Sequence, residues 1–238
     1  VQFGAIDTSS GLDFSNAFAS CYSMKTLPTL NTGAGTNFTQ MFNGCYQATS
    51  MAPLNLASGT NFTGMFKNCR LLETIPPLNT AAGTIFNAML ESTYLLRVSP
   101  LSNTALATDL GRLYTSCLSL TSLPAIDTSL NTTFDSFAHT NRSLRKVGTM
   151  NANSAVGALA LKDAFLYCAS LTQARLDNAK VDVSYNFCQL GPAALVDIFN
   201  GLATVVGKTI TITNNWGASL LTPAERAIAT GKGWTIVG

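Results

Sequence analysis

Charged side chains are scarce in this 238-residue chain, where Asp, Glu, Lys and Arg make up only 11% of the residues, less than half of the usual share. The formal net charge is +2, and no run of basic residues is longer than two. Nucleic-acid binding needs a stripe or patch of Lys and Arg, so we expect no nucleic-acid partner. Ser, Thr, Asn and Gly fill the polar positions instead, which is common in secreted, cell-surface and viral structural proteins.

Long apolar runs and catalytic signatures are missing as well. No apolar stretch approaches the length of a membrane span, and no signal peptide is visible, so we expect no membrane insertion. The chain starts at Val1 instead of Met, as a processed chain or a piece of a longer protein does. No P-loop, dinucleotide fingerprint, H-E-x-x-H or G-x-S-x-G motif occurs. We therefore predict no cofactor, no metal site and no catalytic residue.

The lone histidine and the twelve carboxylates do not form a recognisable catalytic motif. His139 has no visible nucleophile partner, so we interpret it as a surface or joint residue. Asp13, Asp109 and Asp135 stand near the starts of expected helices, where the helix dipole favours negative charge. A catalytic pair of carboxylates on one face of adjacent turns, as glycosidases need, stays open as an alternative.

A 24-residue repeat dominates the sequence, and a fixed period of this length is typical of a solenoid. Phe14, Phe38, Phe62 and Phe86 are each 24 residues apart. The same spacing holds for a second aromatic column, a cysteine column, three Leu-rich columns and a polar column. The polar column consists of Asp7, Asn31, Asn55, Asn79, Asn103 and Asp127. The phase slips by three residues after Asn151, and the unit at 93–102 is irregular because Val98 and Leu101 each come one place early.

Each unit predicts a short helix followed by an extended segment. The pattern F-x-x-M-F-x-x-C has the spacing of one helix face, whereas the following L-x-x-L-P-x-L-N-T is short and its Pro breaks helices. Such a unit cannot bury its apolar face alone, so neighbours must stack. The Asn or Asp is expected to hydrogen-bond the backbone of its own or the next turn. We predict an α/β solenoid of leucine-rich-repeat type, with about seven helix–strand units over residues 1–190.

The pattern MF-x-x-C-x-x-L, followed by a Pro-x-Leu-Asn/Asp-Thr turn, resembles the BspA-like leucine-rich repeats. These occur in bacterial surface proteins and in phage virion proteins. The resemblance covers residues 3–190. The ordinary signature L-x-x-L-x-L-x-x-N is absent, so a smooth horseshoe is not expected.

Residues 191–238 are predicted to close the solenoid as helix–strand capping units continuous with it. Pro192 begins a helix with four apolar residues on one face, and residues 209–213 alternate as a strand does. Thr222-Pro-Ala-Glu225 is a capping box whose helix ends at Gly231, and residues 234–237 form a last strand. Residues 207–238 also resemble the closing segment of many phage-encoded repeat proteins, in which endings like IATGKGWT recur.

The cysteines and glycosylation sequons fit structural roles better than chemical ones. Five of the six cysteines occupy one repeat column, and no C-x-x-C or Cys/His pairing appears. We predict buried, free thiols that act as small hydrophobic residues, with disulfides as the alternative. The N-x-S/T sequences at Asn37 and Asn61 lie in the repeated joint and are interpreted as turn chemistry. Two more such sequences occur, at Asn131 and Asn141.

These observations favour a non-catalytic phage virion protein: a tail-fibre or receptor-binding module, or a capsid decoration protein. A bacterial cell-surface or secreted adhesin is the alternative, and a polysaccharide-degrading enzyme is the third candidate. The expected partners are other virion proteins or a host-surface receptor, glycans included, and self-association stays open. The candidate binding residues vary between the constant columns, and an ordinary solvated face is the competing interpretation. They are Lys25, Gln47, Arg70, Glu73, Arg97 and Ser119.

Overall fold

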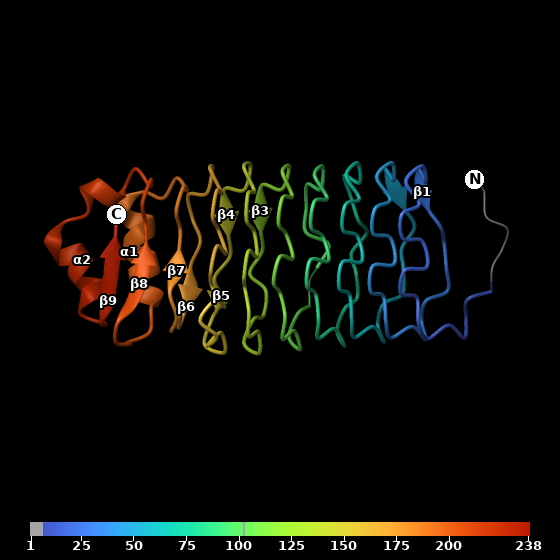
Figure 1. Ribbon diagram of the computed structural model, residues 1–238, viewed down its shortest axis with the longest axis horizontal. Coiled ribbons are helices and arrows are strands. Elements are labelled where there is room, and N and C mark those ends of the chain that lie inside the picture. Colours follow the sequence, from blue (N-terminus) through green and yellow to red (C-terminus); the bar gives the residue numbers. More distant parts are fainter. Residues whose placement is uncertain (1–6, 102) are drawn as a thin grey trace.

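The computed structural model describes residues 7–101 and 103–238, and its chain winds into a β-solenoid of about eight turns. The turns are stacked along the long axis of the molecule (Figure 1). Parallel bridges join equivalent residues of neighbouring turns, such as Asp13 with Asn37 and Asn37 with Asn61. The predicted repeat solenoid is therefore confirmed. Residues 1–6, which begin the expected repeat region, lie outside the described residues, and so does Ser102.

The predicted helix in each repeat is wrong. The segment from Phe14 to Cys21 forms successive tight turns, in which Asn16 and Ser20 adopt left-handed backbone angles with φ of 57° and 61°. The Phe14 amide donates to the Asn37 carbonyl of the next turn at 2.9 Å, whereas a helix bonds its amides to carbonyls four residues back. Tight turns that recur every four residues point the same side chains inward as a helix would. The repeats are thus not helix–strand units of leucine-rich-repeat type.

The strands of the repeat region are only two residues long, and each pairs in parallel with its equivalent in a neighbouring turn. They are β1 (Thr26–Leu27), β2 (Ser50–Met51), β3 (Ser122–Leu123), β4 (Lys146–Val147), β5 (Met150–Asn151), β6 (Leu176–Asp177) and β7 (Val183–Ser184). The pairs are β1 with β2, β3 with β4, and β5 with β6, and β7 joins the C-terminal sheet. In the irregular unit, Leu101 pairs with Leu78, a spacing of 23 residues, which matches the apolar residue expected one place early.

The C-terminal elements appear where the sequence predicts them. Helix α1 (Pro192–Gly201) buries Leu195, Ile198 and Phe199. Strands β8 (Lys208–Thr211) and β9 (Trp234–Val237) extend the sheet from β7 in the order β7-β8-β9. A 3-10 turn, η1 (Ala218–Leu220), precedes α2 (Pro223–Thr230), whose Thr222–Glu225 capping box is complete. Neither helix of the described chain is long and apolar enough to span a bilayer.

The core is a set of side-chain columns that run along the solenoid axis. Phe38 stacks on Phe14 and Phe62 with ring centroids 5.5 and 5.6 Å apart, and Phe62 packs on Phe86 at 5.3 Å. A second column stacks Phe18, Phe42 and Phe66. Because each ring packs between rings of the neighbouring turns, the core is continuous from turn to turn.

Polar side chains hold the outer corners of the coil. Asn55 accepts a hydrogen bond from the Ala57 amide at 3.2 Å, and other members of the polar column repeat this contact within their own turns. The predicted hydrogen bonding of this column is confirmed. The next residue is often a buried Thr that reaches the following turn, as Thr32 does when it donates to the Asn55 carbonyl at 2.6 Å.

Candidate functional site

The six predicted binding residues all lie on one edge of the solenoid. We define the cationic edge as residues 22–26 and the equivalent residues of the next five turns: 46–50, 70–74, 94–98, 118–122 and 142–146. Lys25, Glu73 and Arg97 are equivalent positions. Backbone hydrogen bonds fix this alignment, since the Arg97 amide donates to the Glu73 carbonyl at 3.2 Å. Gln47, Ser119 and Arg70 occupy the two neighbouring columns of the same edge.

A stack of side chains forms one column of this edge, with Tyr22 and Arg70 exposed and Tyr46 and Tyr94 half-buried. The Tyr22 and Tyr46 rings are stacked with centroids 4.9 Å apart. The Arg70 guanidinium follows, 4.4 Å from the Tyr46 ring centroid and 5.6 Å from that of Tyr94. Both distances lie within the range of cation–π attraction. The stack fixes the side chains in place and leaves the outer rim of Arg70 open to solvent.

Positive charge gathers on the edge although no basic run exists in the sequence. Six cationic side chains stand there against one acidic side chain, Glu73, and all six are exposed. They are Lys25, Arg70, Arg97, Arg142, Arg145 and Lys146. The only ion pair among them joins the Arg97 Nε to Glu73 at 3.2 Å, with both side chains more than half exposed, so it contributes little stability. Of these cations, the sequence-based candidates miss Arg142, Arg145 and Lys146, which a tally by repeat position would have found.

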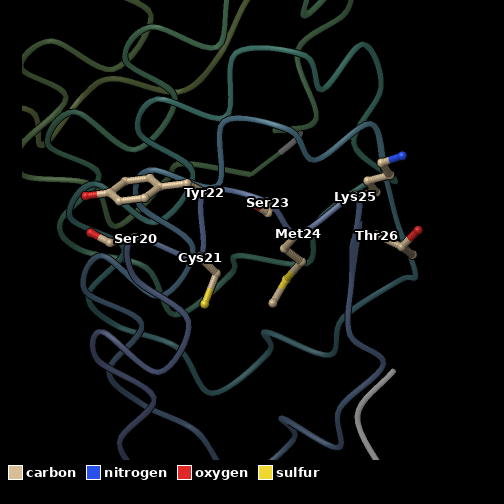
Figure 2. Close-up of a pocket in the computed structure, with 7 residues that line it drawn as sticks. All are labelled: Ser20, Cys21, Tyr22, Ser23, Met24, Lys25 and Thr26. Atoms are coloured by element: carbon tan, nitrogen blue, oxygen red, sulfur yellow. The ribbon is translucent and has the colours of Figure 1, made fainter. Parts of the chain in front are cut away.

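The end of the solenoid where the edge begins is hollowed. A pocket there is lined by residues 20–26, and Figure 2 shows the Cys21 and Met24 side chains pointing into the same space, away from Tyr22 and Lys25. Both sulfur-bearing residues are only half-buried. Cys21 is therefore the one described cysteine that is not fully buried.

The cysteine column is a hydrogen-bonding column as well as an apolar one. The Cys45 thiol donates to the Phe18 carbonyl and the Cys69 thiol to the Phe42 carbonyl, each at 3.3 Å. Thr93, which interrupts the cysteine series, makes the equivalent bond to the Phe66 carbonyl at 3.1 Å. The column thus needs a small side chain that can donate a hydrogen bond. This requirement explains why the residue that interrupts the cysteine series is Thr93 and not an aliphatic residue.

Replacing Cys69 by Thr or by Val tests this requirement with two side chains of nearly equal shape. Cys69→Thr keeps a donor for the Phe42 carbonyl, whereas Cys69→Val removes it. We expect the Val variant to be less stable than the Thr variant by about 1 kcal/mol, measured by urea unfolding. Equal stability of the two variants would show that the column requires only apolar volume.

Burial controls the reactivity of these thiols. Desolvation raises the pKa of Cys45 and of Cys168 to about 12, and it also raises the pKa values of Cys69, Cys117 and Cys188. All six cysteines are free in the structure. Because the thiolate is the reactive species, the five buried thiols are inert at neutral pH.

A thiol titration at pH 8 should give one equivalent in the folded protein, from Cys21, and six in denaturant. A Cys21→Ser variant should give none when folded. Because the pKa of Cys45 is higher in the folded than in the unfolded state, stability should fall as the pH rises from about 8.5. Fewer than six thiols in denaturant would reveal disulfides and contradict the structure.

A second group of titratable side chains surrounds His139. Burial lowers the pKa of this imidazole, the charges of Asp163 and Asp135 raise it, and Arg112 lowers it, with burial the strongest effect. His139 Nδ1 also lies 2.7 Å from the Thr140 hydroxyl. His139 is half-buried in the segment of successive tight turns of its repeat, so it is neither fully exposed nor in the core.

The predicted helix-dipole role of three carboxylates is wrong, because no helix follows them. Asp13 and Asp109 instead accept hydrogen bonds from the amides two residues on, Ser15 and Gly111, at 2.8 Å. The third carboxylate belongs to Asp135, whose backbone amide donates a hydrogen bond to the Thr133 hydroxyl at 3.2 Å.

The sequon asparagines are structural. Asn37 and Asn61 each accept the amide and the hydroxyl of a Thr two residues on, which is the predicted turn chemistry. Asn131 and Asn141 are fully buried. In the described part of the chain, no group of three or more His, Cys, Asp and Glu is arranged to hold a metal.

Comparison with known proteins gives no relative: no family model, curated protein or solved structure matches the chain. The resemblance to BspA-like repeats therefore stays a prediction.

Proposed function

We propose that this chain is a non-catalytic binding protein that uses the cationic edge as its contact surface. The observation that carries the proposal is the stack of Tyr22, Tyr46, Arg70 and Tyr94 along that edge. Side chains held in place by their neighbours lose little conformational freedom when a partner binds, and this preorganisation favours affinity. Equivalent residues of consecutive turns also lie side by side along the edge, as the hydrogen bond from the Arg97 amide to the Glu73 carbonyl shows.

The proposal places the protein on a phage virion, as a tail-fibre or receptor-binding module or a capsid decoration protein. The support is the weakly charged, hydroxyl- and amide-rich composition and the resemblance of residues 207–238 to phage repeat proteins. A rigid coil with buried thiols suits a particle that must survive outside a cell. The proposed partners are neighbouring virion proteins or a receptor on the host surface.

Immunogold labelling of purified virus particles tests this placement. An antibody raised against the folded chain should label particles from the source culture, with particles that lack the gene as the control. Label over the shell would indicate decoration, and label at the tail tip would indicate receptor binding. Label on bacterial cells and none on particles would contradict the proposal and favour the surface adhesin.

Glycoside hydrolysis is the second candidate function, favoured by the group around His139. Asp135 and Asp163 come from adjacent turns, and the charges of both raise the pKa of the same imidazole, so they are the carboxylate pair that such an enzyme would use. Release of reducing ends from a polysaccharide by the wild type, and its loss in Asp135→Asn and Asp163→Asn, would establish an enzyme. Release that persists in both variants would exclude this site.

A further inference from the structure

We infer that the cationic edge binds an acidic polysaccharide, with the carboxylates of the polymer lying along successive turns of the solenoid. This inference rests on the proposed binding function of the same edge and names the chemical class of its partner.

The density of positive charge on the edge fits a polymer with widely spaced negative charges. The six exposed cations are spread unevenly over six turns: three lie on residues 142–146, one each on residues 22–26, 70–74 and 94–98, and none on the other two turns. Neighbouring turns of stacked strands are roughly 4.8 Å apart, so the edge averages about one positive charge per 5 Å. Duplex DNA carries about one negative charge per 1.7 Å of its axis. A uronic-acid polymer, with one carboxylate on each sugar, is a closer match to the edge than a nucleic acid.

The geometry of the aromatic side chains supports the same choice. Single-stranded nucleic acids bind by stacking bases on exposed aromatic faces. Here Tyr46 is stacked on Tyr22 on one side and on the Arg70 guanidinium on the other, so its faces are covered and its rim is presented to solvent. The edge can therefore offer hydroxyls and guanidinium N–H groups, which suit the carboxylates and hydroxyls of a sugar.

Arg70 is exposed and lies within cation–π distance of both the Tyr46 and Tyr94 rings. The N–H donors of a guanidinium lie in one plane, and such planar donors bind carboxylates in pairs. The same edge carries the hydroxyls of Thr26, Thr49 and Ser50. The Ser50 hydroxyl donates a hydrogen bond to the Thr26 hydroxyl of the previous turn at 3.4 Å. The edge thus carries both cations and hydroxyls.

The distribution of acidic residues favours this edge over another side of the repeats for a polyanion. Residues 7–16 and their equivalents lie about half a turn away, and they hold six carboxylates against only two cations, Arg112 and Lys162. The six are Asp7, Asp13, Asp109, Asp127, Asp135 and Asp163. A polyanion is therefore repelled from that side and attracted to the other, although the whole chain carries a net charge of only +2.

The test compares two variants that lose the same charge from different places. The edge variant is Arg142→Gln, Arg145→Gln, Lys146→Gln, which removes the densest cations of the edge. The control variant is Lys162→Gln, Lys180→Gln, Lys208→Gln, which removes three cations from elsewhere on the described surface. Binding of the full chain to polygalacturonate, neutral dextran and single-stranded DNA is measured by biolayer interferometry at two salt concentrations. Circular dichroism confirms that each variant folds.

We expect the wild type to bind polygalacturonate more tightly than DNA, with no binding to dextran and weaker binding at the higher salt concentration. The edge variant should lose at least tenfold in affinity, while the control variant stays within twofold of the wild type. Equal losses in both variants would mean attraction by net charge only and would overturn the inference. So would tighter binding to DNA, equal binding to dextran, or no binding to polygalacturonate. Particle labelling without polygalacturonate binding would leave the proposed virion function standing and remove only this partner.

Discussion

Phe62→Ala should lower the free energy of unfolding by about 3–5 kcal/mol, because it opens a cavity in the middle of the continuous core. The Phe62 ring is fully buried and lies between those of Phe38 and Phe86, at centroid distances of 5.6 and 5.3 Å. Urea unfolding monitored by circular dichroism measures the change. Loss of this ring also removes a stacking partner from both neighbouring turns, so the effect should extend beyond one repeat.

Tyr22→Ala provides the matched control for this prediction. It also deletes one aromatic ring from a stack, but Tyr22 is 52% exposed and has its ring partner, Tyr46, on one side. We expect it to cost less than about 1 kcal/mol. If Phe62→Ala cost no more than Tyr22→Ala, the continuous aromatic core would be wrong.

Gly59→Ala should destabilise the protein by about 1–3 kcal/mol through overpacking. A Cβ atom at Gly59 would lie 2.5 Å from the Phe62 ring and 2.9 Å from the Phe38 ring. The sequence itself shows the compensation, since two turns further on the equivalent pair is Ala107 with Leu110. Alanine thus replaces glycine at the position where leucine replaces the phenylalanine ring.

A double-mutant cycle tests this coupling. In a Phe62→Leu background, Gly59→Ala should cost less than half of what it costs in the wild type, because the pair then resembles Ala107 with Leu110. Unfolding in urea gives the four stabilities that the cycle needs. Additive effects of the two substitutions would contradict the predicted contact between residue 59 and the ring.

The sequence predicts the columns of the solenoid well because side chains in stacked turns are repeated at a fixed spacing. The buried positions of Phe38, Phe62 and Cys69, the turn contacts of Asn55 and the elements of the C-terminal cap were all predicted from spacing and capping motifs. Both α1 and α2 begin with a proline at the first helical position, and this local signal does not depend on the repeat.

The backbone conformation between the columns could not be predicted in the same way. Apolar residues at i, i+3, i+4 and i+7 fit one face of a helix, but successive tight turns place the same residues inward. Two residues of each repeat adopt a left-handed angle, and Gly and Asn tolerate this angle best. Asn16, Gly44, Gly64 and Asn68 fit this preference, but Gln40, Ala88 and Arg112 occupy equivalent positions, so the residue types alone do not distinguish the turns from a helix.

The candidate site shows the same division. Lys25, Arg70 and Arg97 were selected because they vary between constant columns, and the structure brings them to one edge. The charge of the edge does not appear as a basic run in the sequence, because a solenoid gathers residues that are 24 positions apart. The stacking of Arg70 between two tyrosines depends on side-chain geometry that the sequence does not contain.

The helix content of the folded chain tests the account most directly, because the edge exists only if the repeats are stacked turns without helices. Far-UV circular dichroism of the purified chain measures it. The described residues form α-helices of 10 and 8 residues in a chain of 238, so we predict a helical fraction below about one tenth. A helical fraction near one third would mean that each repeat contains a two-turn helix, and it would contradict the fold and the site built on it.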